Sequence, residues 1–436
     1  MADILIAALS PTGHVGPMLS IAQDLVDRGD RVTVMTGAAH TQAILAVGAQ
    51  PHLLPTIADF DESRFDSVAR GNNSGARGLN LAITRLFLIP MPHQAHQLAT
   101  AIAKAPFDAI VVDYGFFGIL PFLLGDPQDR PPVLYYTPTP LMVSSRDTAP
   151  NGMGLPPGSG VLAKVRNRTL NLLSQKVILR ESHRTANAML DALGVPRLPV
   201  FLLDVGVLAD RLIVPTVPTF EYPRGDLPEN VRFVGAVHPQ PCSGYVPPRW
   251  WPELDGGRPV VHVTQGTVDN DDLSRLIEPT IEALSGENVT IVATTGGRDV
   301  GDIKAALPAN ALVAEYIPHD VLLPKVDVMV TNGGYGAVQR ALSTGVPLVV
   351  AGSTEDKPEV AARVAWSGAG INLRTGTPSP SMIRDAVRSI LSDGNYQRRA
   401  HELEADFARR DGVAEIAALV DEVIMERKPA ADRSYG

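Results

Sequence analysis

The alternation of short apolar runs with helix-length amphipathic stretches constrains the fold of this chain more than any other feature. Near the N-terminus, β-branched apolar runs at residues 4–9 and 31–36 alternate with amphipathic stretches at 17–28 and 41–47. Strands that are buried on both faces of a parallel sheet read as such continuous apolar runs, and helical crossovers connect them. The pattern therefore predicts a doubly wound α/β fold.

This rhythm occurs twice along the chain. Runs at 109–112 and 133–137 and a largely helical stretch at 162–193 continue the first part. The rhythm restarts after residue 259, with predicted strands at 260–263, 289–293, 311–314, 326–330 and 346–350. A chain of 436 residues with 45% hydrophobic residues can bury two cores of ordinary domain size. We therefore predict two Rossmann-like domains.

A segment dense in proline separates the two parts. Regular helices and central strands do not accommodate this density, so we interpret residues 216–258 as an interdomain connection. The predicted domains are then residues 1–215 and residues 259–412, and residues 413–436 form a last helix and a tail.

Charge and cysteine content narrow the function classes. A formal net charge of -9 argues against nucleic acid as a partner, because phosphate-backbone binding needs concentrated Lys and Arg. The single cysteine, Cys242, cannot form an internal disulfide, and no secretory signal pattern is recognisable, so we expect a cytoplasmic protein. No apolar run reaches the roughly 18 residues of a spanning helix, and we expect no stable membrane insertion.

Two polar residues follow predicted strands of the first domain. His14 lies in the turn after the first strand, before a helix predicted to open at Pro17, and Asp113 directly follows residues 109–112. Parallel strands end at one edge of their sheet, where such folds bind ligands, so the two side chains could meet. A carboxylate that accepts one ring N–H leaves the other nitrogen as a base with a pKa of about 6.5. The alternatives are that His14 and Asp113 merely cap the helices that follow them.

Two turns of the second domain could hold an anion. Gln265-Gly266-Thr267 follows the strand at 260–263 and offers backbone N–H groups and a hydroxyl. In Thr331-Asn332-Gly333-Gly334-Tyr335-Gly336, three glycines between a buried strand and a helix allow a diphosphate to approach the backbone closely. Glycine-rich turns also serve simply for tight packing.

The order of the motifs in this half is specific. Tyr316-Ile317-Pro318-His319, residues 332–336, Gly345-Val346-Pro347, Glu355-Asp356-Lys357 and residues 361–364 follow one another along the chain. Together they resemble the donor-binding motif of the family 1 glycosyltransferases. Gly13-His14-Val15-Gly16-Pro17 is similar to the bacterial branch that glycosylates macrolides and other natural products.

The resemblance implies a GT-B fold, in which two Rossmann-like domains face each other across a cleft. The N-terminal domain would hold the acceptor and the C-terminal domain the nucleotide sugar, and the last helix would pack back across the first domain. His14 would match the general base and Asp113 its orienting carboxylate, in a transfer with inversion. The family generally needs no metal or other cofactor, because the nucleotide sugar is a co-substrate.

The resemblance also assigns donor contacts. Gly266, Thr267 and the glycines Gly333, Gly334 and Gly336 would form the diphosphate cradle. Tyr316 would stack on the base, Ile317 and His319 would lie beside it, and Asp356 would hold sugar hydroxyls.

Three residues depart from the family pattern. Asn332 stands where a histidine usually contacts the phosphates, and Lys357 replaces a glutamine that reads the sugar. Arg340 replaces a glutamate that often binds the ribose, which makes a dTDP-sugar a candidate donor. UDP-glucose is nevertheless favoured slightly, as the commoner donor.

Apolar residues in the first domain suggest the acceptor. Ring and thioether side chains in or beside its loops, Phe87, Phe116 and Met142 foremost, could line a pocket for a hydrophobic hydroxylated small molecule such as a macrolide or other polyketide. Further candidates of this kind are Phe60, Phe65, Leu86, Met91, Phe117 and Met153. His93 and His96 resemble half a metal site but lack further ligands, and we interpret them as a solvated helix face.

Two other functions stay open at this point. A nucleotide-sugar epimerase or hydrolase could use the same scaffold, but it would need catalytic carboxylates facing the sugar. A non-catalytic auxiliary protein could share the fold, but the presence of both His14 and Asp113 argues against it. The sequence does not distinguish a monomer from a homodimer.

Overall fold

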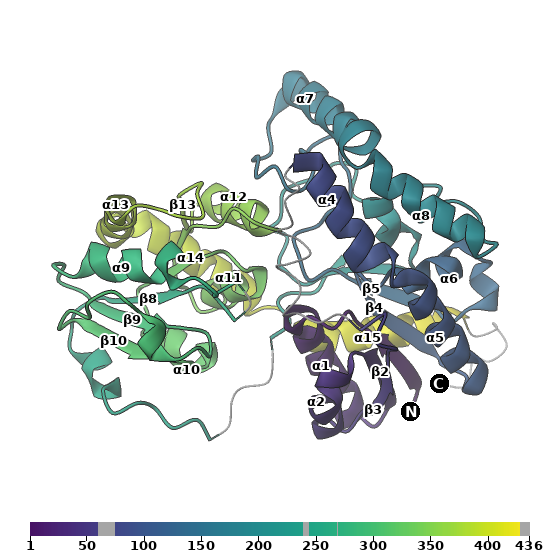
Figure 1. Ribbon diagram of the computed structural model, residues 1–436, viewed down its shortest axis with the longest axis horizontal. Helices are drawn as coiled ribbons and strands as arrows, with labels where there is room; N and C mark the ends of the chain where they lie inside the picture. Colours follow the sequence, from purple (N-terminus) through teal and green to yellow (C-terminus); the bar gives the residue numbers. More distant parts are fainter. Residues whose placement is uncertain (60–74, 239–243, 268, 428–436) are drawn as a thin grey trace.

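Two parallel β-sheets, each flanked by helices, make up the protein (Figure 1). The computed structural model describes residues 1–59, 75–238, 244–267 and 269–427. The predicted acceptor residues Phe60 and Phe65 and the single cysteine, Cys242, lie outside the described residues.

The first sheet has seven strands in the order β3-β2-β1-β4-β5-β6-β7, and all adjacent pairs are parallel. Its strands are β1 (Asp3–Ala7), β2 (Arg31–Thr36), β3 (Gln50–Leu53), β4 (Ala109–Asp113), β5 (Val133–Tyr136), β6 (Arg211–Val214) and β7 (Val231–Phe233). Successive side chains of a strand point to opposite faces. Ile4 and Ile6 therefore join one core together with α1, whereas Leu5 and Ala7 join the core on the other face together with α5.

The second sheet has six parallel strands in the order β10-β9-β8-β11-β12-β13. These strands are β8 (Val260–Thr264), β9 (Thr290–Thr294), β10 (Ala311–Ala314), β11 (Val328–Thr331), β12 (Leu348–Val350) and β13 (Gly370–Asn372). Helices α9 and α13 pack on one face through Ile281 and Ile383, and α11 and α14 cover the other through Val338 and Leu403. The predicted pair of doubly wound sheets is thus confirmed.

The helices fall into the two parts of the chain in the same way. Those that precede the second sheet are α1 (Thr12–Asp27), α2 (Thr41–Ala46), α4 (Gly75–Ile83), α5 (Met91–Lys104), α6 (Leu120–Leu124), α7 (Gly160–Leu173) and α8 (Arg180–Ala192). The later ones are α9 (Ile277–Leu284), α10 (His319–Leu322), α11 (Tyr335–Leu342), α12 (Lys357–Ser367), α13 (Pro380–Ser392), α14 (Gly394–Phe407) and α15 (Gly412–Arg427).

The start of α1 differs from the sequence prediction. The helix begins at Thr12, so His14 lies in its first turn, and Pro17 lies inside the helix. A proline removes only one backbone donor, and a helix can continue through it at a cost. The prediction that the helix opens at Pro17 was wrong because it gave this proline the role of a first residue.

The proline-rich segment contributes one strand to the first sheet. β7 pairs with β6 at the end of the sheet, and the described residues of 216–258 otherwise contain only one short 3-10 helix, Trp251–Asp255. An edge strand tolerates nearby prolines because one of its sides carries no ladder hydrogen bonds.

The last helix lies against the first domain (Figure 1). Ile416, Val420 and Val423 of α15 are buried in the same core as Ile4 and Val15. Among the described residues, no helix combines the length and apolarity that crossing a membrane requires.

Candidate active site

The strand orders place one topological switch point in each domain. In the first sheet, successive strands are added outward from β1 on one side and from β4 on the other, so the strand order reverses between β1 and β4. In the second sheet the same reversal occurs between β8 and β11. Ligands of open α/β sheets bind outside the carboxyl ends of the strands at such points. His14 and Asp113 follow β1 and end β4, and the turns at Gly266 and Asn332 follow β8 and β11.

His14 and Asp113 form a close pair at the first switch point. The imidazole Nδ1 lies 2.9 Å from Asp113 Oδ1 and 2.8 Å from Oδ2. The Asp113 side chain is fully buried, whereas 26% of the His14 side chain is exposed. An Nδ1–H that donates to the carboxylate leaves Nε2 in the basic form. The carboxylate faces the histidine, and only the backbone oxygen of Asp113 accepts from the turn that follows, at Phe116.

Glycines at the second switch point leave the backbone accessible, because no side chain covers it. A Cβ atom added to Gly266, Gly334 or Gly336 would meet no atom within 4 Å. Gly334 and Gly336 also have no positive φ, so neither packing nor backbone conformation requires glycine there. Gly333 is different, because its φ of 91° and the nearby Val350 favour glycine on internal grounds. The turn therefore offers backbone N–H groups and the N-terminus of α11 to an anionic ligand.

Asn332 holds the two turns of this switch point together. Its side-chain Nδ2 donates to the backbone oxygen of Gln265 at 2.6 Å, and the residue is 9% exposed. A histidine at this position could carry a positive charge, whereas the asparagine amide is committed in part to this internal bond.

The predicted base-binding residues lie on both sides of Pro318. Tyr316 is 55% exposed and presents a ring for stacking, whereas Ile317 is buried. The His319 ring contacts that of His262 edge to face, with 5.8 Å between centroids. Burial, helped by the positive charges of His262 and Arg340, lowers the pKa of His319 to about 3, so this imidazole is neutral at pH 7.

Arg340 lies half-buried on α11, close to these histidines. Burial lowers the pKa of its guanidinium, although the charge of Asp320 opposes this effect. Of the ion pairs between described residues, none involves Arg340, so its charge is available to a ligand.

Asp356 connects the second switch point to the first. It is half-buried at the residue before α12, and burial together with the charge of Glu355 raises the pKa of its carboxyl to about 6. Lys357 and His14 oppose this shift. The two domains therefore bring the Asp356 carboxylate and the His14 imidazole close enough for one charge to act on the other.

Lys357 lies in an ion-pair network. Its ammonium pairs with Glu355, lies 3.3 Å from Asp269 Oδ2, and donates to Thr354 Oγ1 at 3.2 Å. Although burial alone would lower it, these carboxylates raise the pKa of Lys357, which therefore stays charged. Asp269 also binds Arg275, at 2.6 Å. The structure thus gives Lys357 a role in joining two loops of the second domain.

The predicted acceptor residues occupy different environments. Met142 lines a small, partly open pocket of about 20 Å³ between the two domains. Phe87 is half-buried and its ring lies 6.0 Å from that of Phe117. Phe116 is 0% exposed and belongs to the first core, so in this structure the ring has no surface for an acceptor. His93 and His96 are both exposed on α5.

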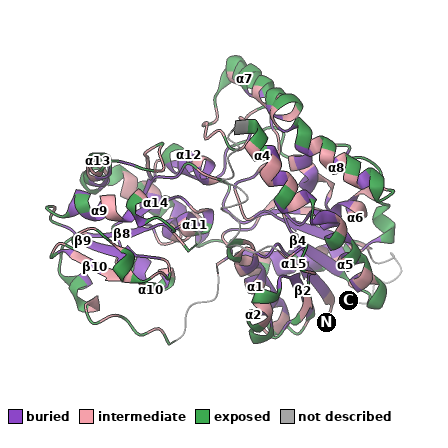
Figure 2. Ribbon diagram, viewed as in Figure 1, coloured by how far each residue is buried: buried purple, intermediate pink, exposed green. Residues whose placement is uncertain are grey.

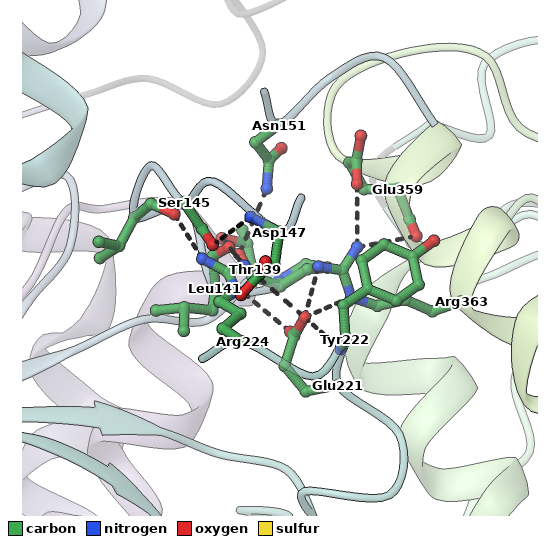
Figure 3. A network of polar contacts seen from close by, with 12 residues as sticks. Thr139, Leu141, Ser145, Asp147, Asn151, Glu221, Tyr222, Arg224, Glu359 and Arg363 are labelled. Atoms are coloured by element: carbon green, nitrogen blue, oxygen red, sulfur yellow. Dashed lines mark hydrogen bonds and ion pairs between the residues drawn. The ribbon is translucent and has the colours of Figure 1, made fainter. Parts of the chain in front are cut away.

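A buried polar network fixes α12 against the first domain (Figure 3). Arg363 Nη2 lies 2.6 Å from Glu221 Oε1, and Arg363 Nη1 lies 2.9 Å from Glu359 Oε2. Glu359 Oε1 accepts from the backbone N–H groups of Gly152 and Gly154, at 3.0 and 2.7 Å. Because α12 begins one residue after Asp356, this network sets the position of Asp356 relative to the first domain.

The charges in this network compensate one another. Burial alone would raise the pKa of Glu221, but the positive charges of Arg363 and Arg224 hold it below its usual value. The Arg363 guanidinium also lies 4.1 Å from the centre of the Tyr222 ring, a cation–π contact. All the full charges of the network are thus paired.

Sequence reasoning missed this network. Glu221 and Arg363 are 142 residues apart, and Glu221 lies in a segment that we interpret as a connection. Only the i, i+4 spacing of Glu359 and Arg363 on one helix could have indicated part of it.

Comparison with known proteins places this site in a family. Residues 279–423 match the family described as "Erythromycin biosynthesis protein CIII-like, C-terminal domain". The chain is 42% identical to 4'-demethylrebeccamycin synthase of Lentzea aerocolonigenes, over 97% of this chain and 100% of the relative. It is 36% identical to UDP-glycosyltransferase 2 of Phaeomoniella chlamydospora, over 96% of this chain and 95% of that protein.

Solved structures share the fold. The calicheamicin glycosyltransferase CalG4 aligns over 98% of this chain and 100% of its own, with a TM-score of 0.71 and 24% identity. The glycosyltransferase of kitacinnamycin aligns over 97% of this chain and 98% of its own, also with a TM-score of 0.71, at 22% identity. Both have the two-domain architecture described above.

Proposed function

The chain belongs to the family 1 glycosyltransferases, in their bacterial natural-product branch, and we propose that it transfers a hexose to a hydroxyl group of a hydrophobic small molecule. The acceptor class we propose is a macrolide or other polyketide. The donor is a nucleotide diphosphate sugar, and UDP-glucose is favoured over dTDP-sugars. The reaction proceeds with inversion and needs no metal or other cofactor.

The pairing of His14 with Asp113 is the observation that carries this proposal. Buried Asp113 accepts from Nδ1, which orients the ring and stabilises the imidazolium that forms when Nε2 removes the proton of the acceptor hydroxyl. The resulting nucleophile attacks the anomeric carbon of the sugar, and the bond to the nucleoside diphosphate breaks. An epimerase has no acceptor hydroxyl to deprotonate, whereas a hydrolase would use such a base on water, so a transfer assay distinguishes transfer from hydrolysis.

The second switch point would bind the donor. Backbone N–H groups at Gly334 and Gly336 and the N-terminal end of α11 would stabilise the charge that develops on the departing diphosphate, with Gly266, Thr267 and Gly333 beside them. The exposed Tyr316 ring would stack on the base, between Ile317 and His319. Asp356 would accept hydrogen bonds from sugar hydroxyls.

The departures from the family pattern affect donor choice. Asn332 and Lys357 hold loops together, so the sugar and the phosphates would be recognised mainly by Asp356 and by backbone groups. Arg340 carries no carboxylate for a ribose diol, which keeps dTDP-sugars as candidate donors.

The test is a donor titration followed by transfer assays. Calorimetric titration with UDP-glucose and dTDP-glucose should give binding of at least one, and the parent protein should then glycosylate members of a panel of hydroxylated polyketides. His14→Ala should lower kcat by roughly 10²- to 10⁴-fold, and well above the pKa of Asp356 it should leave donor affinity unchanged. His96→Ala, an exposed histidine on α5, is the control and should have no effect. Failure of every nucleotide sugar to bind, or a His14→Ala rate within a few-fold of the parent, contradicts the proposal.

A further inference from the structure

Helix α7 and the π-helical turn that continues it, Ser174–Ile178, present apolar side chains to the outside. Six Val and Leu side chains of this segment are between 44% and 87% exposed. They are Val161, Leu162, Val165, Leu172, Leu173 and Val177. Val161, Val165 and Leu172 have the spacing i, i+4, i+11 and therefore share one face of α7. We call these six residues the α7 face. Figure 1 shows α7 at the periphery of the molecule, and Figure 2 shows how much of it is exposed.

The inner side of the same helix is polar. Asn167 is 0% exposed, and Asn171 Nδ2 donates to the backbone oxygens of Ser145 and Thr148, both at 3.0 Å. Ser174 continues this row and is buried as well. A surface helix of a globular protein normally turns its apolar side to the core. The polarity of α7 is reversed, so it is attached to the protein by hydrogen bonds while its apolar side lacks a partner within the described chain.

The charge around the α7 face is strongly positive. Residues 160–184 contain six Lys and Arg and one Glu, an excess of five positive charges in a chain whose net charge is -9. The basic residues are Lys164, Arg166, Arg168, Lys176, Arg180 and Arg184. Lys164 lies 3.9 Å from Asp147, and Arg166 donates to Asn167. Of the ion pairs between described residues, none involves the other four.

Three of these cations also line one hollow. Where the π-helical turn passes into α8, a hollow of about 390 Å³ is lined by Lys176, Arg180 and Arg184, with Pro199 and Phe201 among its apolar residues. A hollow lined by both basic and apolar side chains is complementary to a lipid, whose anionic head group is joined to an apolar chain.

We propose that the α7 face docks on an anionic lipid surface, with its aliphatic side chains at the boundary between head groups and acyl chains and its basic residues among the head groups. An amphipathic helix with an aliphatic side bordered by Lys and Arg has the properties of a helix that lies in the membrane interface. A second copy of this chain is a poorer occupant, because a two-fold contact would bring the same positive charges together. A protein partner is disfavoured too, because the six exposed apolar residues include no Trp or Tyr, the side chains that dominate protein interfaces.

This docking is peripheral, and it does not rest on the proposed catalytic role of His14. It would bring the enzyme to the phase in which a hydrophobic acceptor dissolves. Because lipid binding can be measured without donor or acceptor, its failure and the failure of the proposed reaction are separate results.

The experiment is co-sedimentation of the full chain with vesicles of phosphatidylcholine alone and of phosphatidylcholine mixed with phosphatidylglycerol. The parent should sediment with the mixed vesicles at low salt and be released as salt increases. Leu162→Glu/Leu172→Glu should abolish sedimentation, whereas Leu45→Glu/Leu307→Glu, on exposed leucines elsewhere, should not.

Arg168→Gln/Lys176→Gln should weaken binding by roughly thirty-fold, since each basic side chain contributes about a five-fold factor. Arg249→Gln/Lys304→Gln removes two exposed charges elsewhere and should leave binding unchanged.

The controls decide between the occupants. All four variants change exposed positions, so their unfolding temperatures should match that of the parent. Lack of sedimentation of the parent with mixed vesicles overturns the proposal, and so does equal binding to both kinds of vesicle. Vesicle binding that survives Leu162→Glu/Leu172→Glu assigns the contact to another surface. A dimer in sedimentation velocity that this variant abolishes, without vesicle binding, assigns the face to a second copy.

Discussion

The two switch points occupy equivalent places in two similar sheets, yet they offer different chemistry. At the β1/β4 edge, the proposed chemistry rests on side chains, since His14 and Asp113 form a hydrogen-bonded pair. At the β8/β11 edge, the side chains are reduced to hydrogen atoms at Gly334 and Gly336, and the backbone faces open space. The sheet topology thus determines where a ligand binds, whereas the residues that directly follow the strands determine what happens to it.

If this division is correct, the first switch point should affect turnover and the second should affect donor affinity. The joint between the domains, at Arg363, should affect the stability of the fold. Substitutions in each of the three places test this division of roles.

Asp113→Asn should have the largest effect. The amide has nearly the same shape, but it cannot stabilise an imidazolium and can favour the wrong tautomer of His14, so we expect kcat to fall by roughly 10²- to 10⁴-fold. Donor affinity, measured by calorimetry, should stay within two-fold. Asp108→Asn is the matched control, because Asp108 lies at the opposite end of the same strand, where it accepts from the backbone of Asp3. A comparable loss of donor affinity in Asp113→Asn would break the proposed division between the two edges.

Arg363→Met should destabilise the protein by about 3 kcal/mol, because it leaves Glu221 and Glu359 buried with fewer partners. We expect the lower end of the range for broken buried pairs, since Arg224 still lies 3.8 Å from Glu221. Denaturant unfolding followed by circular dichroism measures the effect. Arg388→Met, which breaks an exposed pair with Glu287, should cost much less, because water screens such a pair.

The double variant Glu221→Gln/Arg363→Met sharpens the same measurement. Removal of the buried carboxylate with its partner should recover part of the lost stability, because an unpaired buried charge is the main cost. If the double variant is as unstable as the sum of both single variants, the pair is not the source of the effect.

Gly334→Val should weaken donor binding by roughly ten- to a hundred-fold, as expected for a side chain forced into an occupied site. The protein itself has room for the new side chain, since a Cβ there meets nothing within 4 Å. Unfolding temperature should therefore change little, and calorimetry should detect the loss. Gly286→Val offers the same open surroundings at a distance from both switch points and should bind donor normally. An unchanged donor affinity in Gly334→Val would mean that the bare backbone at this turn serves no ligand.

The sequence allowed much of this arrangement to be predicted, because parallel sheets leave local signals. The short runs rich in apolar residues at β2 and β10 were predicted as strands, and their predicted and observed bounds coincide. The meeting of His14 and Asp113 followed from a general rule, that neighbouring parallel strands end at the same edge.

What escaped prediction depends on pairing between distant residues. Lys357 is buried as a charged residue because it pairs with Asp269, and Arg363 is buried in the same way because it pairs with Glu221. No local sequence pattern connects the two residues of either pair. The start of α1 was predicted wrongly for another reason. Proline is common at the first position of a helix, which suggested that the helix begins at Pro17, but it begins at Thr12.

The smallest predicted effect tests the contact between the two switch points. Because the pKa of Asp356 is raised to about 6, its carboxyl is neutral below that pH and charged above it. A carboxylate accepts stronger hydrogen bonds from sugar hydroxyls than a neutral carboxyl, so affinity for UDP-glucose should rise by about five-fold as pH increases through about 6. Calorimetric titrations across this range measure the midpoint.

His14→Ala should move that midpoint upward, because the positively charged imidazole lowers the pKa of Asp356. Asp356→Asn, which has no proton to lose, should bind the donor with an affinity independent of pH in the same range. A midpoint that is identical with and without His14 would show that the two switch points do not influence each other electrostatically. An upward shift would mean that the two domains hold His14 and Asp356 close enough for their charges to interact, as the proposed transfer between them requires.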